Sequence, residues 1–267
     1  MKIVKGFFHY LGLPFVCLAF LFGLLSVKKA AKKYLRDKNS ILTVDRYKKV
    51  YKLCKKYLFI KHIKVDSHGF NNIPKKPVLY ICNHKSALDP VFFIKTLFEQ
   101  QGLSYFCFIA KNELKNGNKF IKAAMDLIDT IYIERGNLRQ EFEVFQQQLS
   151  AVQDGKSIVI FPEGTRSFVD KFNPFKAASL KVAFKSYIPI VSVSMYGSSG
   201  LSKHEDKTNK DKHKHIYLKA IEVLNPSSFI TSKEEYICEQ LQTKIQHQYD
   251  AIKKLVELKK QVFPKEE

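Results

Sequence analysis

The sequence predicts an α/β protein with a mainly parallel or mixed central sheet flanked by helices, and with an N-terminal membrane-anchoring helical segment. After about residue 62, short apolar runs alternate with stretches of helical periodicity, the pattern of strands and helices layered around one sheet. The chain has 267 residues, 45% of them hydrophobic, which is enough for one domain with a substantial core. We therefore divide the chain into a membrane segment at 1–30, a basic linker with an amphipathic helix at 31–62 and a main domain at 63–260.

The first element is an apolar stretch from Gly6 to Val27, whose 22 residues are enough to cross a bilayer as a helix. Gly12 and Pro14 could instead divide it into a re-entrant or interfacial pair of helices. A signal peptide is a further alternative, although Lys-rich sequence comes next and no persuasive small-residue cleavage site is present. Six basic residues against one acidic residue between 28 and 38 favour a cytoplasmic location for the main domain. We expect membrane association, and leave crossing and one-leaflet insertion both open.

The remaining elements are predicted from the spacing of apolar residues. Helices are expected where apolar residues recur every three or four positions: Val44–Ile60, Pro90–Glu99, Lys119–Ile128, Leu138–Gln153, Lys176–Lys185 and Lys233–Leu258. Strands are expected where short apolar runs are bounded by polar or turn residues: Ile63–Asp66, Val78–Cys82, Tyr105–Ile109, Thr130–Ile133, Ser157–Phe161, Ile190–Met195 and Ile216–Val223.

The net charge of +20 implies an anionic partner, either nucleic acid or an anionic phospholipid membrane. Zinc-finger spacing, an RNA-binding aromatic motif and a clear helix-turn-helix are all missing from the sequence. With the apolar N-terminus, this favours the membrane surface and no nucleic acid. The five cysteines show no paired spacing, which suits reduced thiols in a cytosol-facing domain.

Residues 83–89 read Asn-His-Lys-Ser-Ala-Leu-Asp and directly follow an expected strand. His84 can act as a general base near neutral pH, and Asp89 can fix its tautomer and stabilise its charged form. The spacing works if His84 lies in the turn before a helix and Asp89 in its first turn, which Ser86-x-x-Asp89 as a capping box and Pro90 both support. Free amides at that helix start could also stabilise an oxyanion. The alternative is that Ser86 and Asp89 only cap the helix and His84 is a loop histidine.

Residues 161–167 read Phe-Pro-Glu-Gly-Thr-Arg-Ser and also follow an expected strand. Gly164 lets the backbone approach a ligand closely, and the planar guanidinium of Arg166 suits phosphate oxygens. Thr165 adds a hydroxyl, and Glu163 could orient Arg166 or a substrate hydroxyl. Ligands of α/β sheets collect at the carboxyl ends of strands, so this block predicts a phosphate-binding corner. The alternative is an ordinary turn with surface charges.

These two blocks, in this order, resemble the glycerolipid acyltransferase family, and within it the enzymes that acylate 1-acyl-glycerol-3-phosphate. The resemblance covers about residues 75–200 and rests on several motifs. The matching positions are Asn83, His84, Ser86 and Asp89, then Ala110, Lys111, Glu113 and Leu114, then Ile131–Arg135, Phe161–Ser167 and, more weakly, Ile188–Val191. Glu134 stands where the family often has Asp.

The resemblance implies transfer of an acyl group from a thioester, acyl-CoA or acyl-carrier protein, to the sn-2 hydroxyl of lysophosphatidic acid. His84 would take the hydroxyl proton and Asp89 would orient His84. Arg166, Gly164 and Thr165 would hold the acceptor phosphate.

Arg135 and Lys111 would make further phosphate contacts, and Glu163 would position Arg166 or the glycerol. Neither a cofactor nor a metal is expected.

Other functions remain open at this level. The acceptor could be glycerol-3-phosphate or another lysophospholipid, and a hydrolase is conceivable although the sequence has no Gly-x-Ser-x-Gly motif. A non-catalytic basic protein that binds anionic membranes is the alternative from a different class. We expect a membrane enzyme whose main domain faces the cytoplasm.

Overall fold

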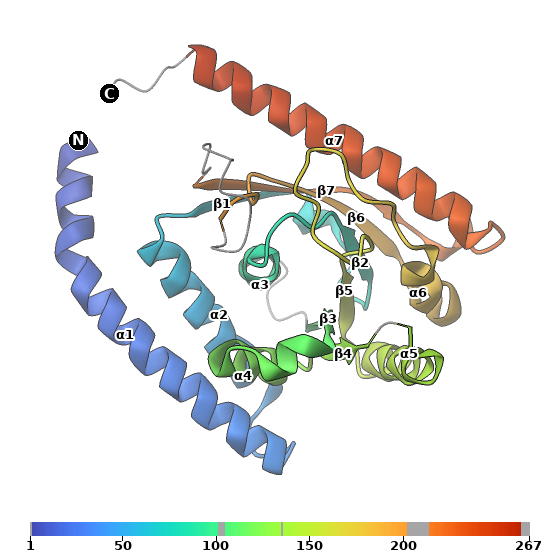
Figure 1. The fold of residues 1–267 in the computed structure, drawn as a ribbon, viewed down its shortest axis with the longest axis horizontal. Helices are drawn as coiled ribbons and strands as arrows, with labels where there is room; N and C mark the ends of the chain where they lie inside the picture. The colour runs from blue at the N-terminus through green and yellow to red at the C-terminus, as the bar shows by residue number, and fades with distance from the viewer. Residues whose placement is uncertain (1, 101–104, 135, 202–213, 263–267) are drawn as a thin grey trace.

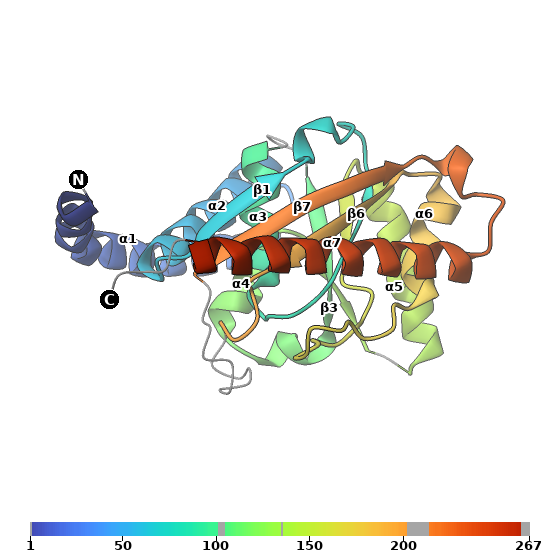
Figure 2. The same cartoon turned by 90° about the horizontal axis from the view of Figure 1, so that it is seen from above.

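The computed structural model describes residues 2–100, 105–134, 136–201 and 214–262, with side chains from residue 12 to residue 258 within these ranges. It begins with two long helices, α1 (Lys2–Arg36) and α2 (Thr43–Ile60), which lie side by side at one end of the molecule (Figure 1). The N-terminal part of α1 extends away from the rest of the chain (Figure 2).

Helix α1 is continuous through Pro14, so the expected alternative of two shorter helices does not occur. A proline removes one backbone hydrogen bond of a helix, but α1 remains helical on both sides of Pro14. The helix also runs through residue 30, where we divided the sequence, because its last turns belong to the core: Val27, Ala30, Ala31 and Tyr34 are buried, and α1 packs on α2 and on α4 (Lys119–Leu127).

A buried ion cluster joins these helices to the main domain. Arg46 of α2 donates to the Leu127 carbonyl at 2.6 Å and pairs with Asp129 at 3.1 Å. The Tyr34 hydroxyl of α1 donates to the other Asp129 oxygen at 2.5 Å, and Lys156 lies 3.1 Å from the same carboxylate. One carboxylate thus connects α1, α2, the turn after α4 and the turn before β5.

All seven predicted strands are present and form one sheet in the order β1-β7-β6-β2-β5-β3-β4. Their bounds are β1 Lys64–His68, β2 Leu79–Cys82, β3 Phe106–Lys111, β4 Ile131–Ile133, β5 Ser157–Ile160, β6 Ile190–Tyr196 and β7 His215–Leu224. Neighbouring strands are parallel except β6 and β7, so the expected mainly parallel or mixed sheet is confirmed. Strands β2, β5 and β6 are buried along their whole length. This explains why β2 and β5 read as short apolar runs, whereas β6 carries two buried serines, Ser192 and Ser194, among its apolar residues.

Helices cover both faces of the sheet (Figure 1). The sheet forms one hydrophobic core with α1, α2, α4 and α3 (Asp89–Gln100). It forms a second hydrophobic core with α5 (Leu138–Gln153), α6 (Lys181–Ser186) and α7 (Glu234–Val262). The helix expected at Lys176–Lys185 is wound as a 3₁₀ turn (Ala177–Leu180) before it becomes α6. Further 3₁₀ turns lie at Phe70–Asn72, Asn112–Asn116 and Pro226–Ser228. The five cysteines are free thiols.

The sheet order brings the two sequence blocks together. Strands β2 and β5 are parallel neighbours near the sheet centre, with Leu79 opposite Ile158 and Ile81 opposite Ile160. Because parallel strands end at the same edge, the residues after Cys82 and those after Ile160 leave the sheet side by side.

Candidate active site

The segment that carries the histidine is fixed by a buried asparagine. The Asn83 side chain donates to the Met195 carbonyl and accepts from the Met195 N–H, both at 2.8 Å. This pair of bonds attaches the end of β2 to the end of β6, directly before His84. The backbone entering the site therefore has one defined path.

His84 and Asp89 form the expected pair. His84 Nδ1 lies 2.9 Å from Asp89 Oδ2, and Asp89 is fully buried. The same oxygen accepts the backbone N–H groups of Lys85 and Ser86, at 2.8 and 2.9 Å. The imidazole stacks on Phe161 with ring centroids 4.4 Å apart, and the His84 side chain is 19% exposed. An imidazole held through Nδ1 presents Nε2 at its opposite edge, the position from which it can take a substrate proton.

The capping box is half formed. Asp89 accepts the Ser86 N–H as predicted, but the Ser86 hydroxyl accepts the N–H of Leu88 at 3.2 Å. The Asp89 N–H donates to the Ser86 carbonyl. The amides of Lys85, Ser86, Leu88 and Asp89 are thus all engaged, so the free N–H groups expected here for an oxyanion are not available. Two of these amides donate to the Asp89 carboxylate, and the other two donate to the hydroxyl and the carbonyl of Ser86.

Glu163 ties the second block to the first. One carboxylate oxygen accepts the His84 N–H at 2.7 Å and the other accepts the Asn173 N–H at 2.8 Å. The Ser167 N–H in turn donates to the His84 carbonyl at 2.9 Å. Glu163 is buried, and burial raises its pKa, while the N–H bonds and the charge of Lys85 lower it in part. Between Glu163 and Ser167, the backbone of Gly164 has φ = 72°, a conformation that favours glycine.

Three of the residues expected to bind phosphate, Thr165, Arg166 and Lys111, lie at or just beyond the carboxyl ends of β5 and β3. Thr165 is exposed and accepts from Asn173 Nδ2 at 3.5 Å. The guanidinium carbon of Arg166 lies 5.7 Å from the Phe168 ring centroid. Lys111 is exposed at the carboxyl end of β3, the strand next to β5. Arg135 lies outside the described residues. Among the residues described, the structure groups no three His, Cys, Asp or Glu side chains that could hold a metal ion.

Lys85 is the site residue that sequence reasoning missed. It follows His84 directly, yet only 2% of it is exposed. Its ammonium donates to Ser167 Oγ at 3.0 Å and to the carbonyls of Val169 and Asp170, the latter at 3.2 Å. A lysine among motif residues reads as a surface charge, because nothing in the local sequence shows which distant residues cover it.

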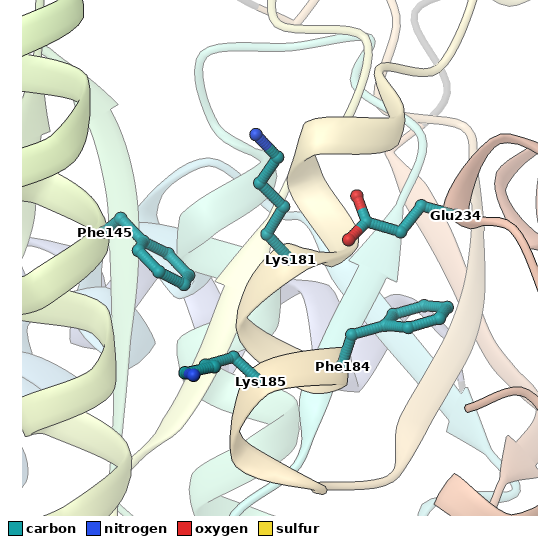
Figure 3. Close-up of a pocket in the computed structure, with 5 residues that line it drawn as sticks. All are labelled: Phe145, Lys181, Phe184, Lys185 and Glu234. Atoms are coloured by element: carbon teal, nitrogen blue, oxygen red, sulfur yellow. The ribbon is translucent and has the colours of Figure 1, made fainter. Parts of the chain in front are cut away.

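A surface pocket of about 330 Å³ lies elsewhere, between α5, α6 and the start of α7 (Figure 3). Its lining is Phe145, Lys181, Phe184, Lys185 and Glu234. Neither block contributes to it, so the pocket does not belong to the site.

Comparison with known proteins decides the family. A family model described as Acyltransferase matches residues 64–196, which include both blocks. A protein of Mycoplasma pneumoniae named probable 1-acyl-sn-glycerol-3-phosphate acyltransferase is 36% identical over 210 residues, covering 79% of this chain and 78% of that one. The chain belongs to the acyltransferase family.

Other relatives agree with this membership. The 1-acyl-sn-glycerol-3-phosphate acyltransferase of Borreliella burgdorferi is 32% identical over 143 residues, covering 53% of this chain and 55% of its own. The crystal structure of the 1-acyl-sn-glycerophosphate (LPA) acyltransferase PlsC from Thermotoga maritima superimposes with a TM-score of 0.64. It is 21% identical and the match covers 95% of this chain and 98% of that one, so the acyltransferases share the whole fold.

Proposed function

We propose that the protein transfers an acyl group from an acyl thioester to the free sn-2 hydroxyl of 1-acyl-glycerol-3-phosphate and so makes phosphatidic acid. The observation that carries this proposal is the contact between His84 and the buried Asp89, held by Glu163 against the Arg166 loop. A general base beside a basic corner is what acylation of a phosphorylated alcohol requires. The names of the relatives support the same reaction.

In this proposal His84 takes the proton of the glycerol hydroxyl as that oxygen attacks the thioester carbonyl carbon. The new C–O bond forms and the C–S bond breaks, and the imidazolium then gives its proton to the departing thiolate. Asp89 stabilises the imidazolium across the 2.9 Å contact. Because a thioester is already activated, direct transfer needs no acyl-enzyme. Glu163 acts by holding the backbone of His84 rather than by touching the reacting atoms.

The acceptor phosphate would lie over the second block. We assign Arg166, Gly164 and Thr165 to that phosphate, and Lys111 and Arg135 to further contacts. A guanidinium pairs with two phosphate oxygens at once, which gives direction as well as charge. Lys111 is well placed for such a contact, since it ends the strand beside β5 at the edge where the blocks leave the sheet.

We also propose that α1 anchors the enzyme in the membrane with the main domain on the cytoplasmic face. The stretch from Gly12 to Arg36 is apolar enough to cross a bilayer, and only 11% of its most apolar window is buried inside the protein. Exposed apolar side chains line it: Phe15, Leu18, Leu21, Phe22 and Leu25. A core helix would bury such side chains, so lipid contact explains them better. An enzyme held at the headgroup plane can release a two-tailed product directly into lipid.

The test is acyl transfer by the purified full-length protein in detergent. Free thiol and lipid product are measured with acyl-CoA or acyl-carrier protein as donor, and with lysophosphatidic acid, glycerol-3-phosphate or another lysophospholipid as acceptor. We expect acceptor-dependent thiol release and phosphatidic acid. Thiol release without any acceptor would indicate a thioesterase, and no release with any pair would indicate a non-catalytic membrane-binding protein.

A further inference from the structure

Lys85 connects the two halves of the site through its main chain and its side chain at once. Its backbone N–H donates to Asp89 at 2.8 Å, within the block that holds the base. Its side chain leaves in another direction and ends among the residues that come after Arg166. One residue therefore contacts both the orienting acid and the proposed acceptor loop.

The ammonium of Lys85 is enclosed by neutral oxygens and aromatic rings. It donates to Ser167 Oγ and to the carbonyls of Val169 and Asp170. It also lies 4.7 Å from the ring centroid of Phe172 and 5.3 Å from that of Tyr249 on α7. The three accepting oxygens belong to a stretch of only four residues, so one nitrogen atom joins several points of this loop. The Ser167 hydroxyl supports the same turn, because it lies 3.0 Å from the Val169 carbonyl and 2.8 Å from that of Lys171.

A buried ammonium at this position calls for an explanation, because its burial costs free energy that an apolar side chain of similar size would not cost. Burial lowers the pKa of Lys85, and the nearby carboxylates of Glu163, Asp170 and Asp89 act in the opposite direction. Lysine is almost never fully buried unless it is paired. The three bonds of the Lys85 side chain share one effect, since each attaches the segment beside His84 to the loop beyond Arg166.

The outer side of the same loop is held by α7. Asp170 is bonded to Tyr249 at 3.4 Å and to Lys253 at 2.7 Å. Gln246 accepts the Phe172 N–H at 3.0 Å. Helix α7 thus holds the loop from outside, and Lys85 reaches it with its side chain from the side of His84.

We propose that Lys85 is a positioning residue that sets the distance between the general base and the acceptor-phosphate corner. The proposal rests on the function proposed above, because it assumes that the acceptor phosphate lies over the Arg166 loop. Lys85 is not a catalytic residue in this view, since its ammonium faces the loop backbone. Its loss should misplace the acceptor much more than the acyl donor.

The test compares Lys85→Met with wild type in the full-length protein, with Lys244→Met as the matched control. Methionine has an unbranched apolar side chain of similar length but lacks the ammonium, so it removes all three donors. Lys244 lies on α7, where it pairs with Glu222 on the surface. We expect Lys85→Met to raise the KM for lysophosphatidic acid about tenfold or more and the KM for the thioester less than about twofold. Lys244→Met should change neither value.

Hydrogen exchange gives a readout that does not depend on turnover. The Ser167 amide is bonded to the His84 carbonyl across the two blocks, and the Asn173 amide is bonded to Glu163 at the other end of the loop. In Lys85→Met they should exchange faster, while amides of β2 and β5 keep their protection. If wild type shows no transferase activity, the proposed function fails, and exchange still tests whether Lys85 holds the loop.

Equal increases in both KM values, a loss confined to kcat, or unchanged exchange at Ser167 and Asn173 would each overturn the proposal. Should Lys85→Met fail to fold, Ser167→Ala takes its place. It leaves the lysine but removes one acceptor of the ammonium, together with the hydroxyl's own bonds to the Val169 and Lys171 carbonyls in the same loop. It should raise the acceptor KM selectively, by about threefold. An unchanged acceptor KM in that variant would also reject the proposal.

Discussion

Replacing Asp89 by asparagine tests the base-acid pair most directly, because it removes one charge and almost no volume. Asp89 Oδ2 receives His84 Nδ1 and the N–H groups of Lys85 and Ser86. An amide oxygen can still accept all three. Within the part of the chain that the structure describes, Oδ1 is buried without a hydrogen-bond partner, so the new NH₂ group would be buried there unsatisfied.

This geometry sets the expected magnitudes. An imidazolium and a carboxylate about 4 Å apart, charge centre to charge centre, interact by about 4 kcal/mol at an effective dielectric constant near 20. Losing that stabilisation in the transition state lowers kcat by about a thousandfold. Weaker bonds to Lys85 and Ser86 and a buried unpaired NH₂ group should lower the free energy of unfolding by about 2 kcal/mol.

The assay is thiol release at saturating donor and acceptor, with the melting temperature measured on the same preparation. Asp154→Asn is the control, because Asp154 is an exposed aspartate at the end of α5. A kcat within about tenfold of wild type in a folded Asp89→Asn protein would refute the reasoning, since that little loss corresponds to about 1.4 kcal/mol.

Three further predictions concern other parts of the molecule. Arg166→Ala should raise the KM for the phosphorylated acceptor more than the KM for the donor. Arg166→Lys should raise the acceptor KM less, because lysine keeps the charge but lacks the bidentate fork. Equal changes in both KM values would reject the assignment. Burial alone would raise the pKa of Asp129, but the Tyr34 hydroxyl and the charges of Lys156 and Arg46 lower it below its ordinary value. Asp129→Asn should therefore cost about 3 kcal/mol of unfolding free energy at pH 7. A lowered pKa contributes stability above the unfolded value near 4, so this difference should shrink in urea melts below about pH 4; a constant difference would contradict the linkage. Deleting residues 1–26 removes the exposed apolar side chains of α1 but keeps its buried end from Val27. The shortened protein should therefore fold and leave anionic vesicles at high salt, whereas the full-length protein should stay bound in sedimentation assays.

The sequence was informative where a feature depends on neighbouring residues. Strands β2 and β5 are buried on both faces, so each leaves a short apolar run that is visible without a structure. The contact between His84 and Asp89 spans five positions and needs only a turn that enters a helix. Both could therefore be predicted from local pattern and local chemistry.

Features that join distant segments could not be predicted in this way. Glu163 was expected to orient Arg166 or substrate, yet both its oxygens hold backbone N–H groups, one of them 79 positions away. The burial of Lys85 depends on the loop at Phe172 and on α7, which no local window contains. The capping box predicted the bond from the Ser86 N–H to Asp89, but the same oxygen also accepts the Lys85 N–H, and Ser86 itself accepts the N–H groups of Leu88 and Asp89.

The pair of hydrogen bonds between Asn83 and Met195 affects the order in which the enzyme folds during its synthesis. It joins residues 112 positions apart, and β2 finds its neighbour β6 only after the whole segment between them has been made. Contacts of such long range form late and slowly during folding. With α1 as the proposed membrane anchor, the ribosome would deliver it to the lipid long before His84 has a fixed place. The protein would then attach to the membrane first and complete its active site afterwards, once α7 has been made and packs on the loop.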